Sequence, residues 1–276
     1  MRAPVVLFAA LLSLLAGDAE AQQRRQTPSR RIAMSAYRAA MGRWHDPARV
    51  PAVRRTDDGR FVLRLHSING RGTAEVSRTT ASTAEAPQFD DAAYAEVARV
   101  MSDQRTNQAH PIDRRLVAIV YAMAEHFAVG QVSVVSGYRA ESRGSNHALG
   151  RAVDVVLPGV SDRQVAEYAR AQGFCGVGIY PSSGFVHVDV RSHSFFWVDR
   201  SAPGRRSARR RSRRRHGGVQ EILGTQARDA DRAASARGVS PFGGYCDPNA
   251  PAAAPNASPS PADEDDEGEA SPPAAR

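Results

Sequence analysis

Two short runs of valine interrupted by polar residues constrain this chain more than any other feature. RAVDVVL and FVHVDV have the length and the β-branched content of strands. Side chains alternate between the two faces of a strand, so Asp154 lies on one face of the first run, and His187 and Asp189 share one face of the second. If the two strands are neighbours in a sheet, Asp154 and His187 can meet.

The loop SNHALG, which precedes the first of these strands, can add a third polar group. Its Gly150 allows the chain to fold His147 over the pair. Two imidazoles and one carboxylate, with a fourth position open to water, form the arrangement of a catalytic zinc site, in which the metal activates water and polarises a carbonyl. Singly, each histidine is more often a surface or hydrogen-bonded residue, and Asp154 can pair with an arginine. The prediction of one zinc ion per chain therefore rests on the combination.

Between residues 60 and 199 the patterns mix strands and helices. RFVLRLHSINGRGTAEV alternates apolar and polar residues around Asn-Gly, which is typical of a β-hairpin. DDAAYAEVARVMSDQR and IDRRLVAIVYAMAEHF repeat apolar residues with a helical period. SDRQVAEYARAQG has Ser161 as a helix N-cap and Gly173 as a C-cap. These patterns predict an α+β fold: a single compact domain whose helices pack on a central antiparallel sheet carrying the zinc site.

The N-terminus has the pattern of a secretory signal. Residues 1–21 hold an arginine, an apolar core too short to span a bilayer, and a small-x-small cleavage site ending at Ala21. A retained anchor is the alternative. No later segment is apolar enough to cross a membrane, so we expect an exported protein, periplasmic or extracellular, that is not an integral membrane protein. Residues 22–59 are expected to be an N-terminal leader with little core of its own.

The chain has a net charge of +8, and its most extreme charge runs lie in the C-terminal part, where residues 205–216 hold eight Arg and residues 263–269 hold six acids. Residues 200–246 form an Arg-rich arm, in which Arg205 to Arg215 are expected to bind anionic envelope polymers. Residues 247–276 are rich in Pro, Ala and acids and are expected to be a disordered tail. Nucleic acid is not an expected partner, because the arm has no groove-reading or aromatic-interleaved motif and the chain has an export signal.

Two cysteines occur, Cys175 and Cys246. In an oxidising compartment an even pair suggests a disulfide, which would tie the far side of the Arg-rich arm to the folded domain. Two unrelated free thiols are the alternative.

The sequence resembles a known enzyme family in a series of motifs. SGYR, SNHALGRAVDV and GVGIYPSSGFVHVDV, followed by Trp197, resemble the zinc D,D-peptidases of peptidoglycan, which include D-alanyl-D-alanine carboxypeptidases. Within them, the chain is most similar to the murein endopeptidase K-like branch of periplasmic enzymes. The resemblance covers about residues 60–199, and its pattern S-x-H-x-x-G-x-A-x-D is specific.

The resemblance implies roles for individual residues. His147, Asp154 and His187 would bind zinc. Arg139, the arginine of SGYR, would lie near the substrate carbonyl, where a permanent charge stabilises the oxyanion of a tetrahedral intermediate; a salt bridge that holds the loop is the alternative. Ser145 would orient a ligand or the loop.

The sequence departs from the family pattern at one position. Many relatives place an acidic general base three residues before the last zinc histidine, where this chain has Gly184. Asp189 is the nearest carboxylate, and it could act as the base or hydrogen-bond a zinc-bound histidine. His193 is a weaker candidate for the base.

Together these features predict an exported zinc peptidase that hydrolyses amide bonds in peptidoglycan peptides, as a D,D-endopeptidase or D,D-carboxypeptidase. A non-catalytic, zinc-containing cell-wall binding module of the same fold is the alternative, and the missing acid at Gly184 is its support. The cleaved bond stays open, because carboxypeptidase trimming, D,D-cleavage and L,D-cleavage differ in the shape of a pocket formed by loops.

Overall fold

The structure, a computed structural model, describes residues 35–80, 87–142, 144–203 and 219–241. The chain divides into two units, Met1–Ala40 and Met41–Arg276. In the first unit the structure describes helical residues 35–40. The expected signal peptide, the Arg-rich stretch 205–216, the acidic tail and Cys246 lie outside the described residues.

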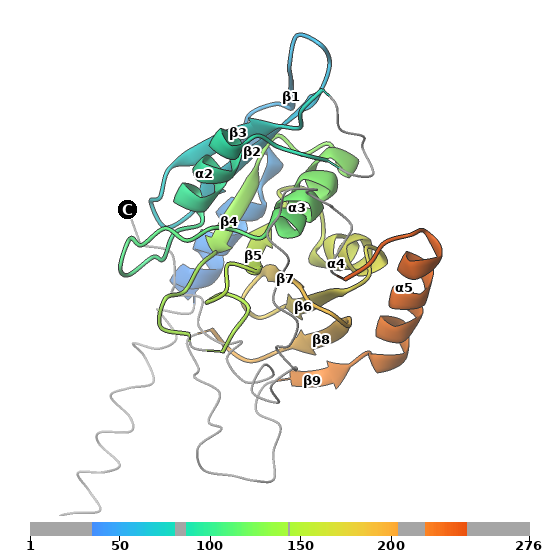
Figure 1. Ribbon diagram of the computed structural model, residues 1–276. Helices are drawn as coiled ribbons and strands as arrows, with labels where there is room; N and C mark the ends of the chain where they lie inside the picture. Colours follow the sequence, from blue (N-terminus) through green and yellow to red (C-terminus); the bar gives the residue numbers. More distant parts are fainter. Residues whose placement is uncertain (1–34, 81–86, 143, 204–218, 242–276) are drawn as a thin grey trace, which may run out of the picture. The chain divides into compact units, whose positions relative to one another are not determined.

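A mixed sheet is the centre of this unit (Figure 1). Its strands are β1 (Arg54–Arg55), β2 (Phe61–Ser67), β3 (Thr73–Ser77), β4 (Val132–Ser136), β5 (Ala152–Val156), β6 (Cys175–Tyr180), β7 (Phe185–Val190), β8 (Phe195–Asp199) and β9 (Val219–Ile222). Their order is β1-β2-β4-β5-β7-β6-β8-β9, with β3 paired to β2. The helices are η1 (Pro47–Arg49), α2 (Asp91–Val100), α3 (Arg114–His126), α4 (Asp162–Ala171) and α5 (Gly224–Ala236).

From the sequence we expected an antiparallel sheet, but the observed sheet is mixed. β2 pairs with β4 in parallel, and so does β6 with β8, whereas the central strands β4, β5, β7 and β6 are antiparallel. Parallel neighbours need a crossover connection. Helices α2 and α3 lie in the connection between β3 and β4. The chain passes from β6 through β7 to β8, and β8 lies on the side of β6 opposite β7. The α+β class itself is confirmed.

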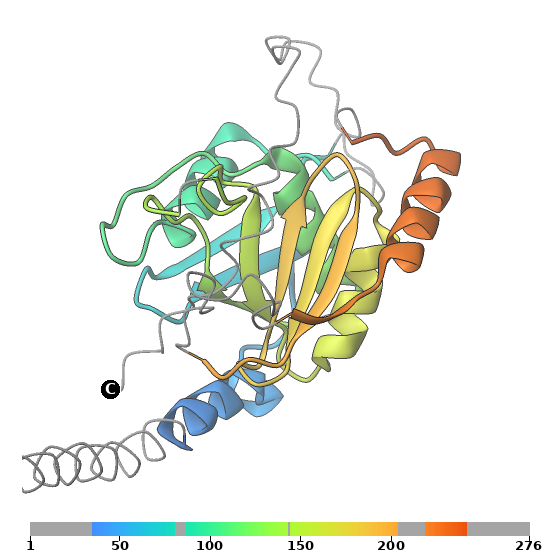
Figure 2. The same ribbon diagram turned by 90° about the horizontal axis from the view of Figure 1, so that it is seen from below.

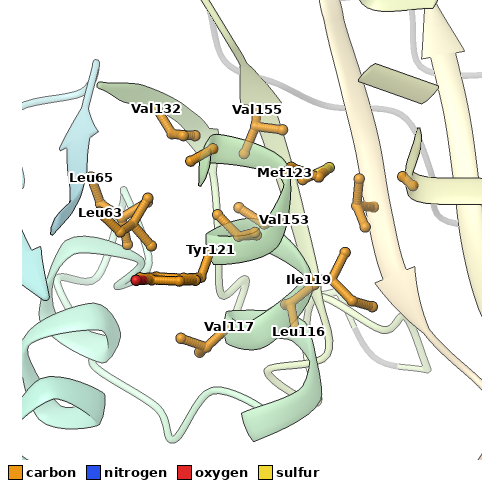
Figure 3. Close-up of a cluster of buried hydrophobic side chains, with 14 of the residues drawn as sticks. Leu63, Leu65, Leu116, Val117, Ile119, Tyr121, Met123, Val132, Val153 and Val155 are labelled. Carbon is orange, nitrogen blue, oxygen red and sulfur yellow. The ribbon is translucent and has the colours of Figure 1, made fainter. Parts of the chain in front are cut away.

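Helices cover one face of the sheet (Figures 1 and 2). The valines that alternate with the polar residues are buried. Figure 3 shows α3 against this face. Val153 and Val155 of β5 belong to the same buried cluster as Leu116, Ile119 and Met123 of α3. Because side chains alternate along a strand, burial of these valines turns the polar residues between them to the other face.

Local signals begin the helices as the sequence predicts. Asp90 caps α2 and Asp113 caps α3, each accepting a hydrogen bond from a backbone N–H in the first turn. Ser161 caps α4 and forms a capping box with Gln164. Gly173 follows the C-cap residue of α4 with a φ of +70°, which glycine adopts readily.

The hairpin expected around Asn69-Gly70 is also present. β2 and β3 pair antiparallel, with Leu65 opposite Ala74, and Gly70 in the turn has a φ of +84°. The turn places Gly70 and its neighbours beside the segment that follows α2.

The fold extends beyond Asp199, where we ended the predicted peptidase domain. β9 pairs antiparallel with β8, and α5 follows it. Asp231 in α5 accepts hydrogen bonds from the backbone N–H groups of Phe174 (2.7 Å) and Ser194 (2.9 Å). These bonds join α5 to the start of β6 and the start of β8. Within the described ranges, no helix has both the length and the apolar character needed to cross a bilayer.

Candidate metal centre

One row of residues crosses the face of the sheet opposite the helices. The registers place Ser136 beside Asp154, Asp154 beside His187, His187 beside Gly178, and Gly178 beside Trp197. The predicted meeting of Asp154 and His187 is therefore observed, since β5 and β7 are direct antiparallel neighbours. This row is the floor of the candidate site.

His147 reaches the row from the loop between β4 and β5. Its Nδ1 lies 2.6 Å from the carbonyl oxygen of Gly137, which can only accept, so Nδ1 carries the proton and donates. Nε2 is then the free ring nitrogen. It lies 3.2 Å from Nδ1 of His187 and 3.5 Å from Oδ1 of Asp154.

The loop can take this course because of Gly150, whose φ is +66°. A Cβ at this position would lie 2.2 Å from the carbonyl oxygen of Pro111, so no larger residue fits without a shift of backbone. Ser145 supports the same loop: its hydroxyl donates to the carbonyl oxygen of Ser142 (2.9 Å) and accepts from the N–H of Ala148 (3.3 Å).

His187 is held on its other side by Asp189. Its Nε2 donates to Oδ2 of Asp189 over 3.0 Å, and its Nδ1 lies 2.9 Å from Oδ1 of Asp154. The Asp189 bond orients the ring so that Nδ1 faces Asp154 and His147.

The three side chains fit a tetrahedral metal ion. Nε2 of His147, Oδ1 of Asp154 and Nδ1 of His187 are separated by 3.2, 2.9 and 3.5 Å. Two ligand atoms on zinc, with bonds of about 2.0–2.1 Å and tetrahedral angles, lie about 3.3 Å apart. All three side chains are buried, and they form a group that could hold a metal ion. Two nitrogens and one oxygen are a donor set that zinc accepts.

Arg139 binds the second oxygen of Asp154. Its Nη2 donates to Oδ2 of Asp154, and its Nε donates to the hydroxyl of Ser136 over 2.8 Å. Burial alone would raise the pKa of Asp154, but its interactions with His147 and with the Arg139 guanidinium outweigh burial and hold that pKa well below its usual range. Asp154 is therefore ionised, with Oδ1 toward the histidines and Oδ2 toward the guanidinium.

Asp189 is fully buried and both of its oxygens are occupied. Oδ1 accepts from Nε of Arg191 (2.7 Å) and from the N–H of Gly176 (3.0 Å). Oδ2 accepts from His187 and from Nη2 of Arg191. Burial opposes the charge, but Arg191 outweighs it, so the pKa of Asp189 is well below its usual range. Asp189 contacts the ring nitrogen of His187 that points away from Asp154.

Two glycines in β6 make room for these groups. A Cβ on Gly176 would lie 2.2 Å from Oδ2 of Asp189, and a Cβ on Gly178 would lie 2.3 Å from the indole of Trp197. The indole lies over Gly178 and reaches His187, with the ring centroids 5.3 Å apart. Sequence reasoning missed the roles of both glycines and of Arg191. Glycines two apart inside a strand were the available signal, because they mark close approach of other groups.

Gly178→Ala should lower the free energy of unfolding by about 1–3 kcal/mol, the usual effect of overpacking a filled interior. The added methyl group would overlap the buried indole of Trp197. Chemical denaturation measures the effect. Gly42→Ala is the matched control, because a Cβ there meets nothing within 4 Å and Gly42 is helical. An equal loss in both variants would contradict the packing explanation.

Two other positions considered in the sequence, His193 and Gly184, are not among the three clustered side chains. His193 is exposed, and its Nδ1 lies 3.1 Å from the hydroxyl of Ser192. Gly184 has a φ of +73°, and its carbonyl oxygen lies 2.9 Å from Nε2 of His45, a residue before the predicted domain.

Cys175 is a buried thiol whose Sγ donates to the carbonyl oxygen of Ala169 over 3.2 Å. Burial raises its pKa to about 12. Cys246 lies outside the described residues, so the Cys175–Cys246 disulfide stays a prediction.

Comparison with known proteins identifies relatives of this chain. Residues 56–194 match the Peptidase_M15_2 family, described as peptidoglycan L,D-endopeptidase MepK. A probable peptidoglycan L,D-endopeptidase MepK of Haemophilus influenzae is 32% identical over 144 residues, which are 47% of this chain and 75% of the relative. Peptidoglycan L,D-endopeptidase MepK of Escherichia coli K12 is 30% identical over 130 residues, covering 40% and 71% of the two chains. No solved structure matches.

Proposed function

Because this chain belongs to the peptidoglycan L,D-endopeptidase MepK family and is a peptidase, we propose that it hydrolyses an L,D-amide bond in peptidoglycan peptides. An L,D-amide joins the carbonyl of an L-centre to the amine of a D-centre. This specificity differs from the D,D-specificity that we expected from the sequence, and it is the specificity for which the relatives are named.

The observation that carries the proposal is the close match between the His147, Asp154 and His187 ligand atoms and a tetrahedral zinc ion. Zinc bound there supplies a Lewis acid that polarises the amide carbonyl and lowers the pKa of water. The presence of these three residues, with Arg139 beside them, is evidence against a module that only binds the cell wall, because binding alone does not require them.

Arg139 has two tasks in the proposed reaction. It neutralises the second oxygen of Asp154, and this bond together with the one to Ser136 uses two of the five N–H groups that a guanidinium carries. The side chain is 15% exposed, so part of it can meet a peptide. A remaining N–H then stabilises the negative charge that develops on the amide oxygen during attack.

We assign Asp189 a positioning role rather than that of the general base. Each of its oxygens already accepts two hydrogen bonds, and it contacts the nitrogen of His187 that points away from the ligand atoms. It keeps the proton on Nε2 of His187, so Nδ1 carries no proton and can serve as a metal ligand. Arg191 and Gly176 hold Asp189 itself in place.

We also propose that the protein acts outside the cytoplasm, where peptidoglycan lies. The predicted signal in residues 1–21 supports this location. The Arg-rich stretch Arg205 to Arg215 would hold the enzyme near anionic envelope polymers.

Digestion of purified muropeptides tests the cleavage specificity. We expect the protein to split a dimer cross-linked through an L,D-amide and to leave a dimer cross-linked through a D,D-amide intact, with products identified by mass spectrometry. Asp154→Ala is the control for contaminating activity. Release of a single terminal residue would instead show a carboxypeptidase, and cleavage of the D,D-dimer alone would contradict the L,D assignment.

A further inference from the structure

The structure contains a polar cavity that none of the three clustered side chains lines. It has a volume of about 330 Å³ and lies between the β2–β3 turn and the segment that follows α2. Its described lining is polar and basic, without a carboxylate. The lining residues are Gly70, Arg71, Arg99, Ser102, Asn107 and Ala109.

Arg71 is positively charged, and none of its described hydrogen-bond partners is a carboxylate. Its Nη1 donates to Oδ1 of Asn107 over 2.6 Å, and its Nη2 donates to the carbonyl oxygen of Gln104. Both acceptors are neutral. Each Nη atom carries two N–H groups, so one N–H on each remains after these two bonds. A negatively charged group in the cavity could accept hydrogen bonds from them.

Arg99, the second arginine, is fixed by the backbone. It donates to the carbonyl oxygens of Arg71 (2.9 Å) and Thr73 (2.8 Å), and it pairs with Glu96 (2.7 Å). Glu96 offsets one of the two guanidinium charges, so the lining retains a positive charge. A Cβ on Gly72 would lie 3.2 Å from Nη1 of Arg99, so this glycine leaves room for the arginine.

The acid of this loop, Asp103, hydrogen-bonds to backbone N–H groups and not to Arg71 among the described contacts. Its Oδ1 accepts from the backbone N–H groups of Arg105 (2.8 Å) and Thr106 (2.7 Å), and its Oδ2 accepts from that of Ala140 (2.7 Å). Its carboxylate is therefore committed to the backbone of the loop.

Backbone contacts join the cavity wall to the segment that carries Arg139. Met101, the neighbour of Ser102, accepts a hydrogen bond from the N–H of Tyr138 over 2.7 Å. A Cβ on Gly137 would lie 2.4 Å from the carbonyl oxygen of Met101, so the two backbones are in contact. The carbonyl of Gly137 accepts the hydrogen bond from His147. One layer of backbone thus separates the cavity wall from a residue of the metal centre.

We infer that this cavity binds a free carboxylate of the peptide substrate while the scissile amide lies at the metal centre. A guanidinium recognises a carboxylate through charge-assisted hydrogen bonds, and Arg71 lines the cavity with one further N–H on each of its two Nη atoms. The inference rests on the proposed peptidase function and deepens it, because it adds a requirement for an anionic group near the cleaved bond. The carboxylate comes from the peptide C-terminus or from an acidic side chain.

Amidated substrates test the inference with the complete enzyme. Three muropeptides are compared: one unmodified, one with its C-terminal carboxylate amidated, and one with its side-chain carboxylates amidated. We expect the wild-type protein to lose about tenfold or more in kcat/KM on one amidated form, which identifies the source of the carboxylate. In Arg71→Met the ratio between the unmodified and that amidated substrate should approach one, and Arg71→Lys should keep part of it.

Arg163→Met is the matched control, because Arg163 is an exposed arginine on α4 that pairs with Glu167. It should keep the wild-type ratio, and zinc content should be equal in all variants. If Arg71→Met lowers kcat/KM equally on the three substrates, or leaves the wild-type ratio unchanged, the inference is wrong and Arg71 is structural. If the wild-type protein cleaves none of them, the proposed function fails instead.

Discussion

His147→Ala and Asp154→Ala should each remove most of the zinc from the protein and lower turnover by about a thousandfold or more. The expected size follows from the several kcal/mol that a metal ion contributes to stabilising charge in the transition state. Each substitution deletes one of three ligand atoms that lie within 4.8 Å of one another. A site with two remaining protein ligands is not the three-ligand arrangement of a catalytic zinc.

Elemental analysis of the purified protein gives the zinc content, which should be about one ion per chain in the wild type. His126→Ala is the control, because His126 is an exposed histidine at the end of α3, where it stacks on Tyr168. It should keep both zinc and turnover. Full zinc occupancy in a folded His147→Ala variant would refute the ligand assignment.

Asp189→Asn should weaken zinc binding by about 10–100-fold, the usual effect of losing a carboxylate that orients a metal-bound histidine. The amide oxygen of asparagine still accepts from Nε2 of His187, so the ring keeps its orientation and loses the nearby negative charge. Competition with a chelator measures the affinity, and turnover is then measured at saturating zinc. Under those conditions we expect most of the activity to return.

The same experiment tests the alternative role of Asp189. A general base contributes about 10²–10⁴-fold to the rate. A loss of that size at saturating zinc, with unchanged zinc affinity, would show that Asp189 is the base. Asp199→Asn is the matched control, since Asp199 is a buried aspartate on β8 that accepts from the N–H of Ser201 over 2.7 Å. It should leave zinc affinity unchanged.

Short-range patterns in the sequence were enough to predict most elements and the strand faces of Asp154 and His187, whereas the set of His147, Asp154 and His187 also rested on the resemblance to a known family. Alternation along a strand depends only on the backbone of that strand, so the faces of Asp154 and His187 followed directly from RAVDVVL and FVHVDV. Caps such as Ser161 act within one helical turn, and the Asn-Gly turn acts between adjacent strands. Each of these signals is local.

The strand order and the environment of Asp189 were decided by tertiary structure. Which strands pair in parallel depends on where the crossovers pass, and no local pattern records that. Asp189 shares a face with His187 in any strand, but its partners Arg191 and Gly176 meet it only because β6 is the next strand. The sequence by itself determined which residues could meet at the metal centre. The packing of β6 and β8 decided what each of them touches, because burial leaves a carboxylate only the donors that neighbouring strands supply.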